Sequence, residues 1–262
     1  MPTIRDFAAA KVSGRKLVVV TAYDASAAKL LAAAPVDALL VGDSVMMVVH
    51  GERDTLGATT ELMALHTKAV ARGAPDRFIV ADLPFLAARR GKSHALEASA
   101  QLLRAGAHAV KVEGIRGHAD VIHHLVESGI PVMGHLGLTP QSVHTLGGYV
   151  VQGREALAAA RLREDAASLA TAGAFAVVLE CVPAALAREI TAALAIPTIG
   201  IGAGVHCDGQ VLVLHDLLGL TPDFKPRFVR RFADGAGLMK AGVIKFAAAV
   251  RAGKFPSAKE SF

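Results

Sequence analysis

The chain has 262 residues, close to the usual size of one (β/α)8 barrel. It is 53% hydrophobic and 19% charged, so it can bury a large core, and intrinsic disorder is excluded. The formal net charge is only +5 and the basic residues are scattered, which argues against a nucleic-acid partner and suits small anionic ligands.

Eight short apolar segments recur along the chain and predict parallel strands. They are continuously apolar rather than alternating, as expected of strands covered on both faces. In chain order they are residues 17–21, 38–42, 78–81, 109–112, 130–134, 176–179, 197–201 and 211–214.

Amphipathic segments rich in Ala and Leu lie between these runs and predict helices at 25–34, 60–72, 93–105, 117–128, 154–172 and 184–193. Glycines 73, 106, 129 and 173 follow four of them, where a left-handed residue commonly ends a helix. This repeated order of helix, glycine and strand favours a (β/α)8 TIM barrel over a doubly wound sheet. We expect a single domain over residues 1–262, with a helical extension at 227–254.

Cysteine usage and the apolar pattern bear on the compartment. Cys181 and Cys207 form neither a CxxC motif nor a disulfide framework, which favours a reducing environment. Residues 1–16 lack the apolar stretch of a signal peptide, and no apolar run is long enough to span a membrane. A cytoplasmic protein without a membrane partner is therefore expected.

Polar side chains end five neighbouring predicted strands, where barrel enzymes carry their catalytic groups. Singly, each has an ordinary explanation: a helix N-cap for an Asp, a packed His, or a structural ion pair between Lys111 and Glu113. Burying several charges in one barrel is costly, however, so the whole set predicts an active site. The set is Asp43, Ser44, Asp82, Lys111, Glu113, His135 and Glu180.

Carboxylates dominate this set, and no Cys or His pair stands at zinc-ligand spacing, which favours a hard cation such as Mg2+. The long segment 139–153, with Gly147-Gly148 and Tyr149, is predicted to be an active-site loop. The glycine-rich run at 200–204 resembles a dinucleotide fingerprint, but Val205 breaks the pattern. Two interpretations stay open for it, an anion-binding loop and a structural turn.

The candidate residues lie in segments that resemble bacterial ketopantoate hydroxymethyltransferase over nearly the whole chain. The longest are Val-Gly-Asp-Ser at 41–44, Ala-Asp-Leu-Pro-Phe at 81–85, Lys-Val-Glu-Gly at 111–114, Gly-His-Leu-Gly-Leu-Thr-Pro-Gln-Ser at 134–142 and Leu-Glu-Cys-Val-Pro at 179–183. Shorter matching segments lie at 21–24, 66–67, 147–149, 152–154, 199–204 and 208–210.

This resemblance implies a barrel of the phosphoenolpyruvate/pyruvate type. It also implies transfer of a hydroxymethyl group from 5,10-methylenetetrahydrofolate to 3-methyl-2-oxobutanoate, through a Mg-stabilised enolate, in pantothenate and coenzyme A biosynthesis. Homodecamers, built as pentamers of dimers, are the assembly it implies.

The resemblance also implies residue roles. Asp43 and Asp82 would bind Mg2+, and Glu113 would complete the metal site. Glu180 would be the general base. The keto acid would be bound by Asp43, Ser44, Asp82, Lys111 and His135.

Departures from the family pattern stand at Gly57, where proline is usual, at Met46-Met47 and at 205–207. Two other functions remain open. A carbon–carbon lyase or mutase of the same superfamily would use the metal but no folate, and a non-catalytic barrel would act as a binding or scaffold protein.

Overall fold

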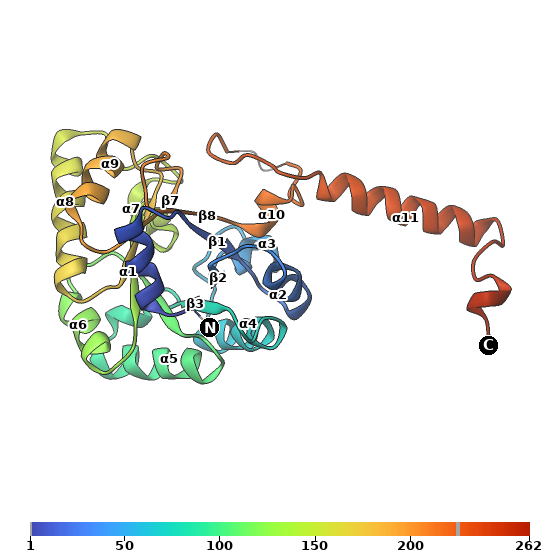
Figure 1. The fold of residues 1–262 in the computed structure, drawn as a ribbon, viewed down its shortest axis with the longest axis horizontal. Helices are drawn as coiled ribbons and strands as arrows, with labels where there is room; N and C mark the ends of the chain where they lie inside the picture. Colours follow the sequence, from blue (N-terminus) through green and yellow to red (C-terminus); the bar gives the residue numbers. More distant parts are fainter. Residues whose placement is uncertain (1, 224–225) are drawn as a thin grey trace. The chain divides into compact units, whose positions relative to one another are not determined.

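The computed structural model describes residues 2–223 and 226–262. The chain divides into two compact units, residues 1–213 and 214–262. The first unit contains the whole barrel, and the second contains the C-terminal helices (Figure 1). The single domain expected from the sequence stays a prediction.

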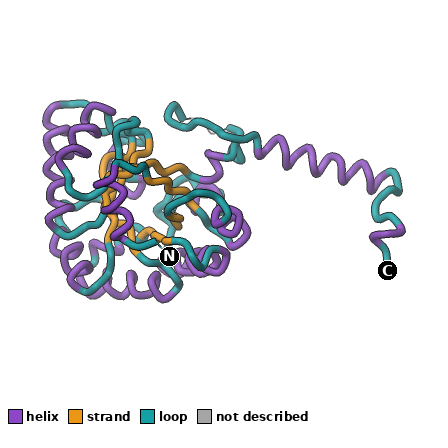
Figure 2. The backbone as a smooth tube through the Cα atoms, in the orientation of Figure 1, coloured by secondary structure: helices purple, strands orange, loops and turns teal. Residues whose placement is uncertain are grey.

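Eight parallel strands close into a barrel in sequence order, which confirms the predicted fold. Figure 2 shows them in orange, enclosed by the purple helices of the first unit. The strands are β1 (Leu17–Thr21), β2 (Ala38–Val41), β3 (Phe78–Asp82), β4 (Ala109–Glu113), β5 (Val132–Gly137), β6 (Ala176–Glu180), β7 (Thr198–Ile201) and β8 (Gly209–Leu212).

The predicted helices of the barrel are all present, with ends that differ by a few residues. Those that follow β1 to β6 are α2 (Ala25–Ala32), α4 (Thr60–Gly73), α5 (Lys92–Arg104), α6 (Ala119–Glu127), α8 (Ala156–Thr171) and α9 (Ala184–Ala193). Short segments not predicted are α3 (Val45–Val48), α7 (Val143–Leu146) and the 3-10 turns η1 (Ala87–Arg89) and η2 (Pro140–Ser142).

An additional helix, α1 (Ile4–Ser13), precedes the barrel and packs against the N-terminal ends of its strands. Phe7 of α1 packs on Phe78 and Phe175, with ring centroids 5.4 and 5.3 Å away. Phe78 begins β3 and Phe175 directly precedes β6, so this aromatic cluster lies at the N-terminal ends of the strands. The polar side chains lie at the opposite end, where the strands finish.

Several details differ from the sequence prediction. Residues 202–208, all described, form a loop without a helix, so the seventh βα unit lacks its helix. Strand β8 begins at Gly209, two residues before the predicted run. A side chain there would collide with Leu17 of β1, its partner in the ladder.

The C-terminal helix α11 (Gly235–Arg251) begins eight residues later than predicted, because Asp234 caps it by accepting a hydrogen bond from Gly237 N at 3.1 Å.

Gly73 serves close packing rather than helix termination. Helix α4 runs through Gly73, and a Cβ there would collide with the backbone of Ala25 in α2. The other three predicted glycines do take left-handed backbone angles, with φ of 112° at Gly106, 83° at Gly129 and 92° at Gly173. The tight contact between α2 and α4 therefore depends on the absence of a side chain.

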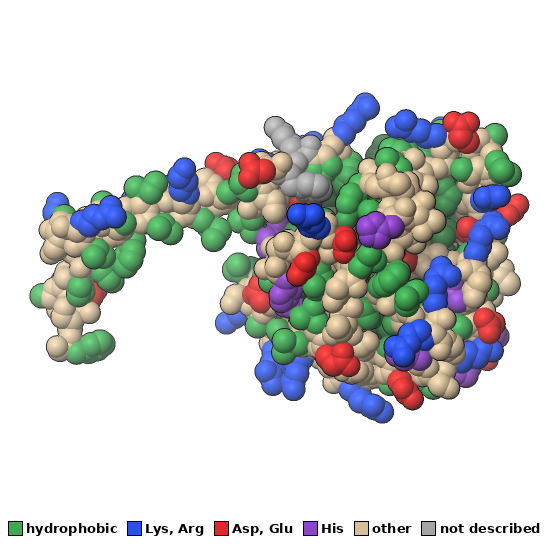
Figure 3. Space-filling model, turned by 180° about the vertical axis from the view of Figure 1, so that it is seen from behind, with side chains coloured by type: hydrophobic (Ala, Val, Ile, Leu, Met, Phe, Trp, Pro, Cys, Tyr) green, Lys and Arg blue, Asp and Glu red, His purple; other side chains and the backbone are tan. Residues whose placement is uncertain are grey.

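The second unit contains α10 (Leu214–Leu217), α11 and the 3-10 turn η3 (Ala258–Glu260). None of the residues of α11 is buried, although it carries many apolar side chains, which Figure 3 shows along its length. The large exposed ones are Leu238, Met239, Val243, Ile244, Phe246 and Val250. Among the described residues, no helix combines the length and apolar character needed to cross a membrane.

Candidate active site

The polar residues predicted from strand ends converge at one end of the barrel. Asp43 and Ser44 follow β2, Asp82 ends β3, Lys111 and Glu113 lie on β4, His135 lies on β5 and Glu180 ends β6. All except Ser44 and Glu180 are buried. A chain of contacts joins all of them except Ser44, which directly follows Asp43 in the chain. The structure therefore brings the predicted set together, and the chemical roles stay predictions.

Asp43, Asp82 and Lys111 form the first part of the cluster. The backbone N–H of Asp43 donates to Asp82 Oδ2 at 3.0 Å, and Lys111 Nζ lies 3.2 Å from Asp82 Oδ1. Burial lowers the pKa of Lys111, but the carboxylates of Asp82, Glu113 and Asp43 outweigh it and raise that pKa overall. Lys111 is therefore held as a cation.

Negative charge accumulates around Asp43. Burial, followed by the nearby carboxylates of Asp82 and Glu113, raises the pKa of Asp43 to about 8, although Lys111 acts in the opposite direction. Burial likewise raises the pKa of Asp82, against the influence of Lys111. The positive charge of Lys111 therefore does not balance the negative charge of these carboxylates. An additional cation at this position would stabilise their ionised forms.

His135 lies between two carboxylates from neighbouring strands. Its Nδ1 is 3.3 Å from Glu113 Oε1, and its Nε2 is 3.2 Å from Glu180 Oε2. Neither contact completes a hydrogen bond of ordinary geometry. Burial and Lys111 lower the pKa of His135, but Glu113 and Glu180 outweigh them and raise it to about 9. His135 thereby links the carboxylate cluster to Glu180.

Side chains alternate along a strand, so Lys111 and Glu113, two positions apart on β4, should share a side, and their contacts agree. Lys111 Nζ lies 3.2 Å from His135 Nδ1, the same nitrogen that Glu113 approaches. Both side chains of β4 therefore point to the same side of the strand.

Ser44 is supported by a residue to which the sequence analysis assigned no role. The hydroxyl of Tyr23, a buried residue, lies 2.8 Å from Ser44 Oγ. His66 Nδ1 in turn lies 2.6 Å from the carbonyl oxygen of Tyr23. Two of the short segments behind the resemblance, 21–24 and 66–67, thus meet beside Ser44.

Gln141 is a second residue that sequence reasoning missed. Its backbone N–H donates to Glu113 Oε2 at 3.0 Å, and its side-chain amide donates to Asp43 Oδ2 at 2.8 Å and to Leu83 O at 2.9 Å. Its only signal in the sequence is its place in the segment 134–142, after a strand-ending His. Gln141 ties the loop after β5 to two of the clustered carboxylates.

The donor set suits a hard divalent cation. Among the described residues, no three His, Cys, Asp or Glu side chains are arranged to hold a metal by themselves. Mg2+ needs only one or two protein carboxylates, because water and substrate oxygens complete its shell. The buried oxygens Asp82 Oδ1 and Glu113 Oε1 complete no hydrogen bond, and the raised pKa of Asp43 reflects the same excess of negative charge.

The sequence pattern of the family described as ketopantoate hydroxymethyltransferase matches residues 2–258 of the chain. The chain belongs to this family. It is 52% identical over 262 residues to the 3-methyl-2-oxobutanoate hydroxymethyltransferase of Bdellovibrio bacteriovorus, with all of both chains covered. It is 49% identical over 252 residues to the enzyme of that name from Coxiella burnetii, covering 96% of this chain and 95% of that one.

Solved structures of other proteins share the fold at low identity. A 2,3-dimethylmalate lyase, a member of the PEP mutase/isocitrate lyase superfamily, superposes with a TM-score of 0.61 at 19% identity, covering 100% of this chain and 93% of that one. A phosphonopyruvate hydrolase, solved with oxalate and Mg2+, has a TM-score of 0.64 at 13% identity, covering 99% and 93%. These likenesses confirm the predicted barrel fold.

Two departures from the family pattern contact each other. A Cβ at Gly57 would lie 3.2 Å from Met46 Cε, which is tighter than ordinary packing. The bulky Met46 and the missing side chain at position 57 are therefore complementary. The neighbouring Met47 accepts a hydrogen bond from the Tyr149 hydroxyl, with Sδ 3.6 Å away, and so contacts the loop after β5.

The glycine run after β7 has structural reasons for its composition. Gly202 and Gly204 have left-handed φ angles of 63° and 84°. A Cβ on Gly204 would lie 2.5 Å from Ala184 Cβ, and Gln210 Nε2 donates to Gly204 O at 2.9 Å. Of the two interpretations, these contacts favour the structural turn.

Proposed function

We propose that this chain transfers a hydroxymethyl group from 5,10-methylenetetrahydrofolate to 3-methyl-2-oxobutanoate, giving ketopantoate for pantothenate and coenzyme A biosynthesis. Family membership supports the reaction. The main structural support for this chemistry is the position of His135. It lies between Glu113, which belongs to the carboxylate cluster, and Glu180. Such a site can polarise a keto acid and remove a proton from it.

Mg2+ is the proposed metal, held by Asp43 and Asp82, with Glu113 completing the site through water. Bound there, it would supply positive charge beside the keto oxygen, where negative charge develops. Lys111 and Ser44 bind the anionic keto acid. The charge of Lys111 is maintained by its carboxylate neighbours, and Ser44 Oγ is oriented by the Tyr23 hydroxyl 2.8 Å away.

Glu180 is the proposed base that accepts the proton from C3 of the keto acid. Its side chain is 16% exposed, so it can reach a bound substrate, whereas the carboxylates deeper in the cluster are more enclosed. His135, 3.2 Å away, orients the Glu180 carboxylate and holds a proton beside it.

Proton NMR of 3-methyl-2-oxobutanoate in D2O with protein and Mg2+ tests this proposal. Exchange of the C3 proton is expected without folate, and ketopantoate is expected only when methylenetetrahydrofolate is added. A lyase or mutase of the same superfamily would turn over without folate. A scaffold protein would show neither exchange nor product, and either result would overturn the proposal.

We further propose a cytoplasmic homodecamer, a pentamer of dimers. The exposed apolar side chains of α11, including Val243, Ile244 and Phe246, support association with other copies of the chain.

A further inference from the structure

The loop after β5 is attached at both of its ends to the open end of the barrel. Gln141, near its start, donates to the carboxylates of Asp43 and Glu113, which follow β2 and end β4. Near its other end, the backbone N–H of Gln152 donates to the carbonyl oxygen of Cys181, directly after β6, at 2.9 Å. The loop therefore passes over the strand ends, beside the carboxylate cluster.

Tyr149 lies within this loop and reaches back across the barrel end. Its hydroxyl donates to Sδ of Met47, a residue of α3 after β2, at 3.6 Å. Burial raises the pKa of Tyr149, and four nearby carboxylates add to this effect. They are Asp54, Asp43, Glu180 and Glu113. The hydroxyl is therefore within electrostatic range of both the proposed metal ligands and the proposed base.

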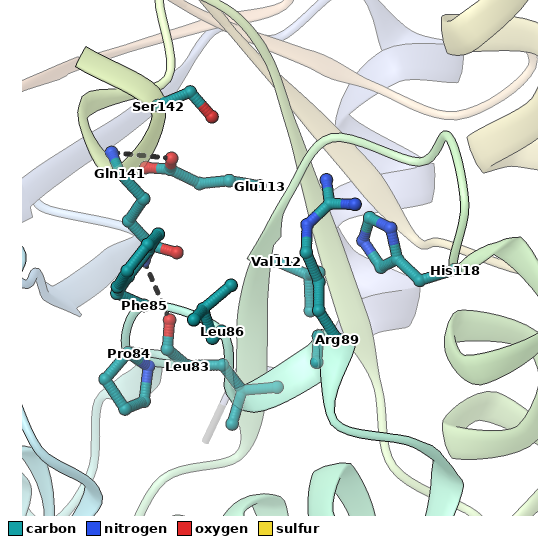
Figure 4. A pocket seen from close by; sticks show the side chains of 11 residues that line it. Leu83, Pro84, Phe85, Leu86, Arg89, Val112, Glu113, His118, Gln141 and Ser142 are labelled. Atoms are coloured by element: carbon teal, nitrogen blue, oxygen red, sulfur yellow. Dashed lines mark hydrogen bonds between the residues drawn. The ribbon is translucent and has the colours of Figure 1, made fainter. Parts of the chain in front are cut away.

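Exposed Phe and Tyr rings of the first unit occur only at this end of the barrel. Of the Phe and Tyr side chains described between residues 2 and 213, Tyr149 and Phe85 alone are exposed, at 51% and 40%. Phe85 follows β3 and lines a small cavity with Glu113 and Gln141, and Figure 4 shows these three side chains on the same side of that cavity. Apolar side chains gathered in water at one place mark a binding surface.

The ring of Tyr149 is poorly suited to the keto acid. That substrate is a small anion, which Lys111, Ser44 and the cation are proposed to bind. The face of an aromatic ring carries partial negative charge, so it does not attract a carboxylate, but it packs well on another flat ring. Because the Tyr149 hydroxyl already contacts Met47, the ring itself is the part that remains for a ligand.

We propose that the ring of Tyr149 stacks on the conjugated rings of the methylenetetrahydrofolate co-substrate. The inference rests on the proposed function, in which this co-substrate delivers the transferred carbon. That carbon joins two nitrogens attached to those rings, so it can reach C3 of the keto acid only when the rings lie at the opening of the barrel, close to Glu180. Tyr149 is thus a co-substrate-binding residue that takes no part in removal of the C3 proton.

Three variants of Tyr149 separate stacking from other roles. Tyr149→Phe keeps the flat ring and removes the hydroxyl, Tyr149→Leu keeps apolar bulk without a flat ring, and Tyr149→Ala removes both. Leu157→Ala is the matched control, because Leu157 is a large apolar residue near the start of α8 that is 66% exposed. Thermal unfolding of each variant reports whether it folds.

Binding is measured by calorimetric titration of tetrahydrofolate, which lacks the transferred carbon, into protein saturated with Mg2+ and keto acid. Tyr149→Ala should weaken this binding by about tenfold or more and Tyr149→Leu by about threefold or more, whereas Tyr149→Phe and Leu157→Ala should stay within about twofold. The KM for methylenetetrahydrofolate should rise in parallel. Deuterium exchange at C3 and the KM for the keto acid should stay within about twofold, since neither involves the folate.

The proposal is overturned if Tyr149→Ala or Tyr149→Leu binds tetrahydrofolate as tightly as the wild-type protein, or if Tyr149→Phe binds as weakly as Tyr149→Ala. It is also overturned if C3 exchange falls together with folate affinity, because the change then disturbs the whole site. A change in the mass of Tyr149→Ala by light scattering would instead assign the ring to an interface between copies and overturn it. If the wild-type protein makes no ketopantoate from methylenetetrahydrofolate, the proposed function itself fails.

Discussion

Replacing Glu180 by Gln tests the base directly. The variant keeps the size of the side chain and one oxygen near His135, 3.2 Å away in the native protein, but it cannot accept the C3 proton. General-base catalysis contributes about 10²- to 10⁴-fold, equivalent to about 2.7 to 5.4 kcal/mol of activation free energy. Deuterium exchange at C3 and ketopantoate formation should therefore fall together by that factor.

Binding of the keto acid should change little in the Glu180→Gln variant. The contacts that hold Asp43, Asp82 and Lys111 together do not involve Glu180. Glu189→Gln is the control, because Glu189 lies exposed on α9 and forms a surface ion pair with Arg163 at 2.6 Å. Exchange at the wild-type rate with no ketopantoate formed would refute the reasoning and assign Glu180 to the folate half of the reaction.

Further predictions concern the metal ligands, the buried charges and the assembly. Asp43→Asn should stay folded but lose Mg2+-dependent turnover, and unchanged Mg2+ dependence would exclude Asp43 as a ligand. Lys111→Met leaves the Asp82 carboxylate buried without its partner and should lower the free energy of unfolding, measured in urea, by about 3–5 kcal/mol. With a chelator present, melting temperature should fall from pH 6.5 to 8, because folded Asp43 and His135, with pKa values raised to about 8 and about 9, retain protons that the unfolded chain releases near 3.8 and 6.5. Each group contributes at most about 1.4 kcal/mol per pH unit, and a flat profile would contradict these shifts. Light scattering should detect a decamer, and a monomer at micromolar concentration would exclude it.

The barrel and most of the candidate site could be predicted because both follow from local patterns. Parallel strands of a barrel all finish at the same end, so polar residues after each apolar run had to meet. Alternation along β4 likewise determined that Lys111 and Glu113 share a side, and both approach His135. These inferences need only the period of a strand and the topology of the fold.

Features that depend on contacts between distant segments could not be predicted. The role of Gln141 depends on how the loop after β5 folds back on Asp43 and Glu113, which no local pattern indicates. Gly73 looked like a helix end, although its requirement comes from the backbone of Ala25. The start of β8 is similarly determined by Leu17, a residue almost two hundred positions earlier.

The hydrogen bonds of Gln141 link the loop after β5 to the binding of a cation. A divalent cation bound by the carboxylates of Asp43 and Glu113 would act on the same two groups that accept hydrogen bonds from Gln141. Cation affinity and the position of the loop after β5 are then linked, and such linkage is reciprocal. Removing the cation with a chelator should therefore change how readily a protease cuts within residues 139–153. By reciprocity, a restraint on that loop should change the affinity for Mg2+ by the same factor by which Mg2+ changes the conformational equilibrium of the loop.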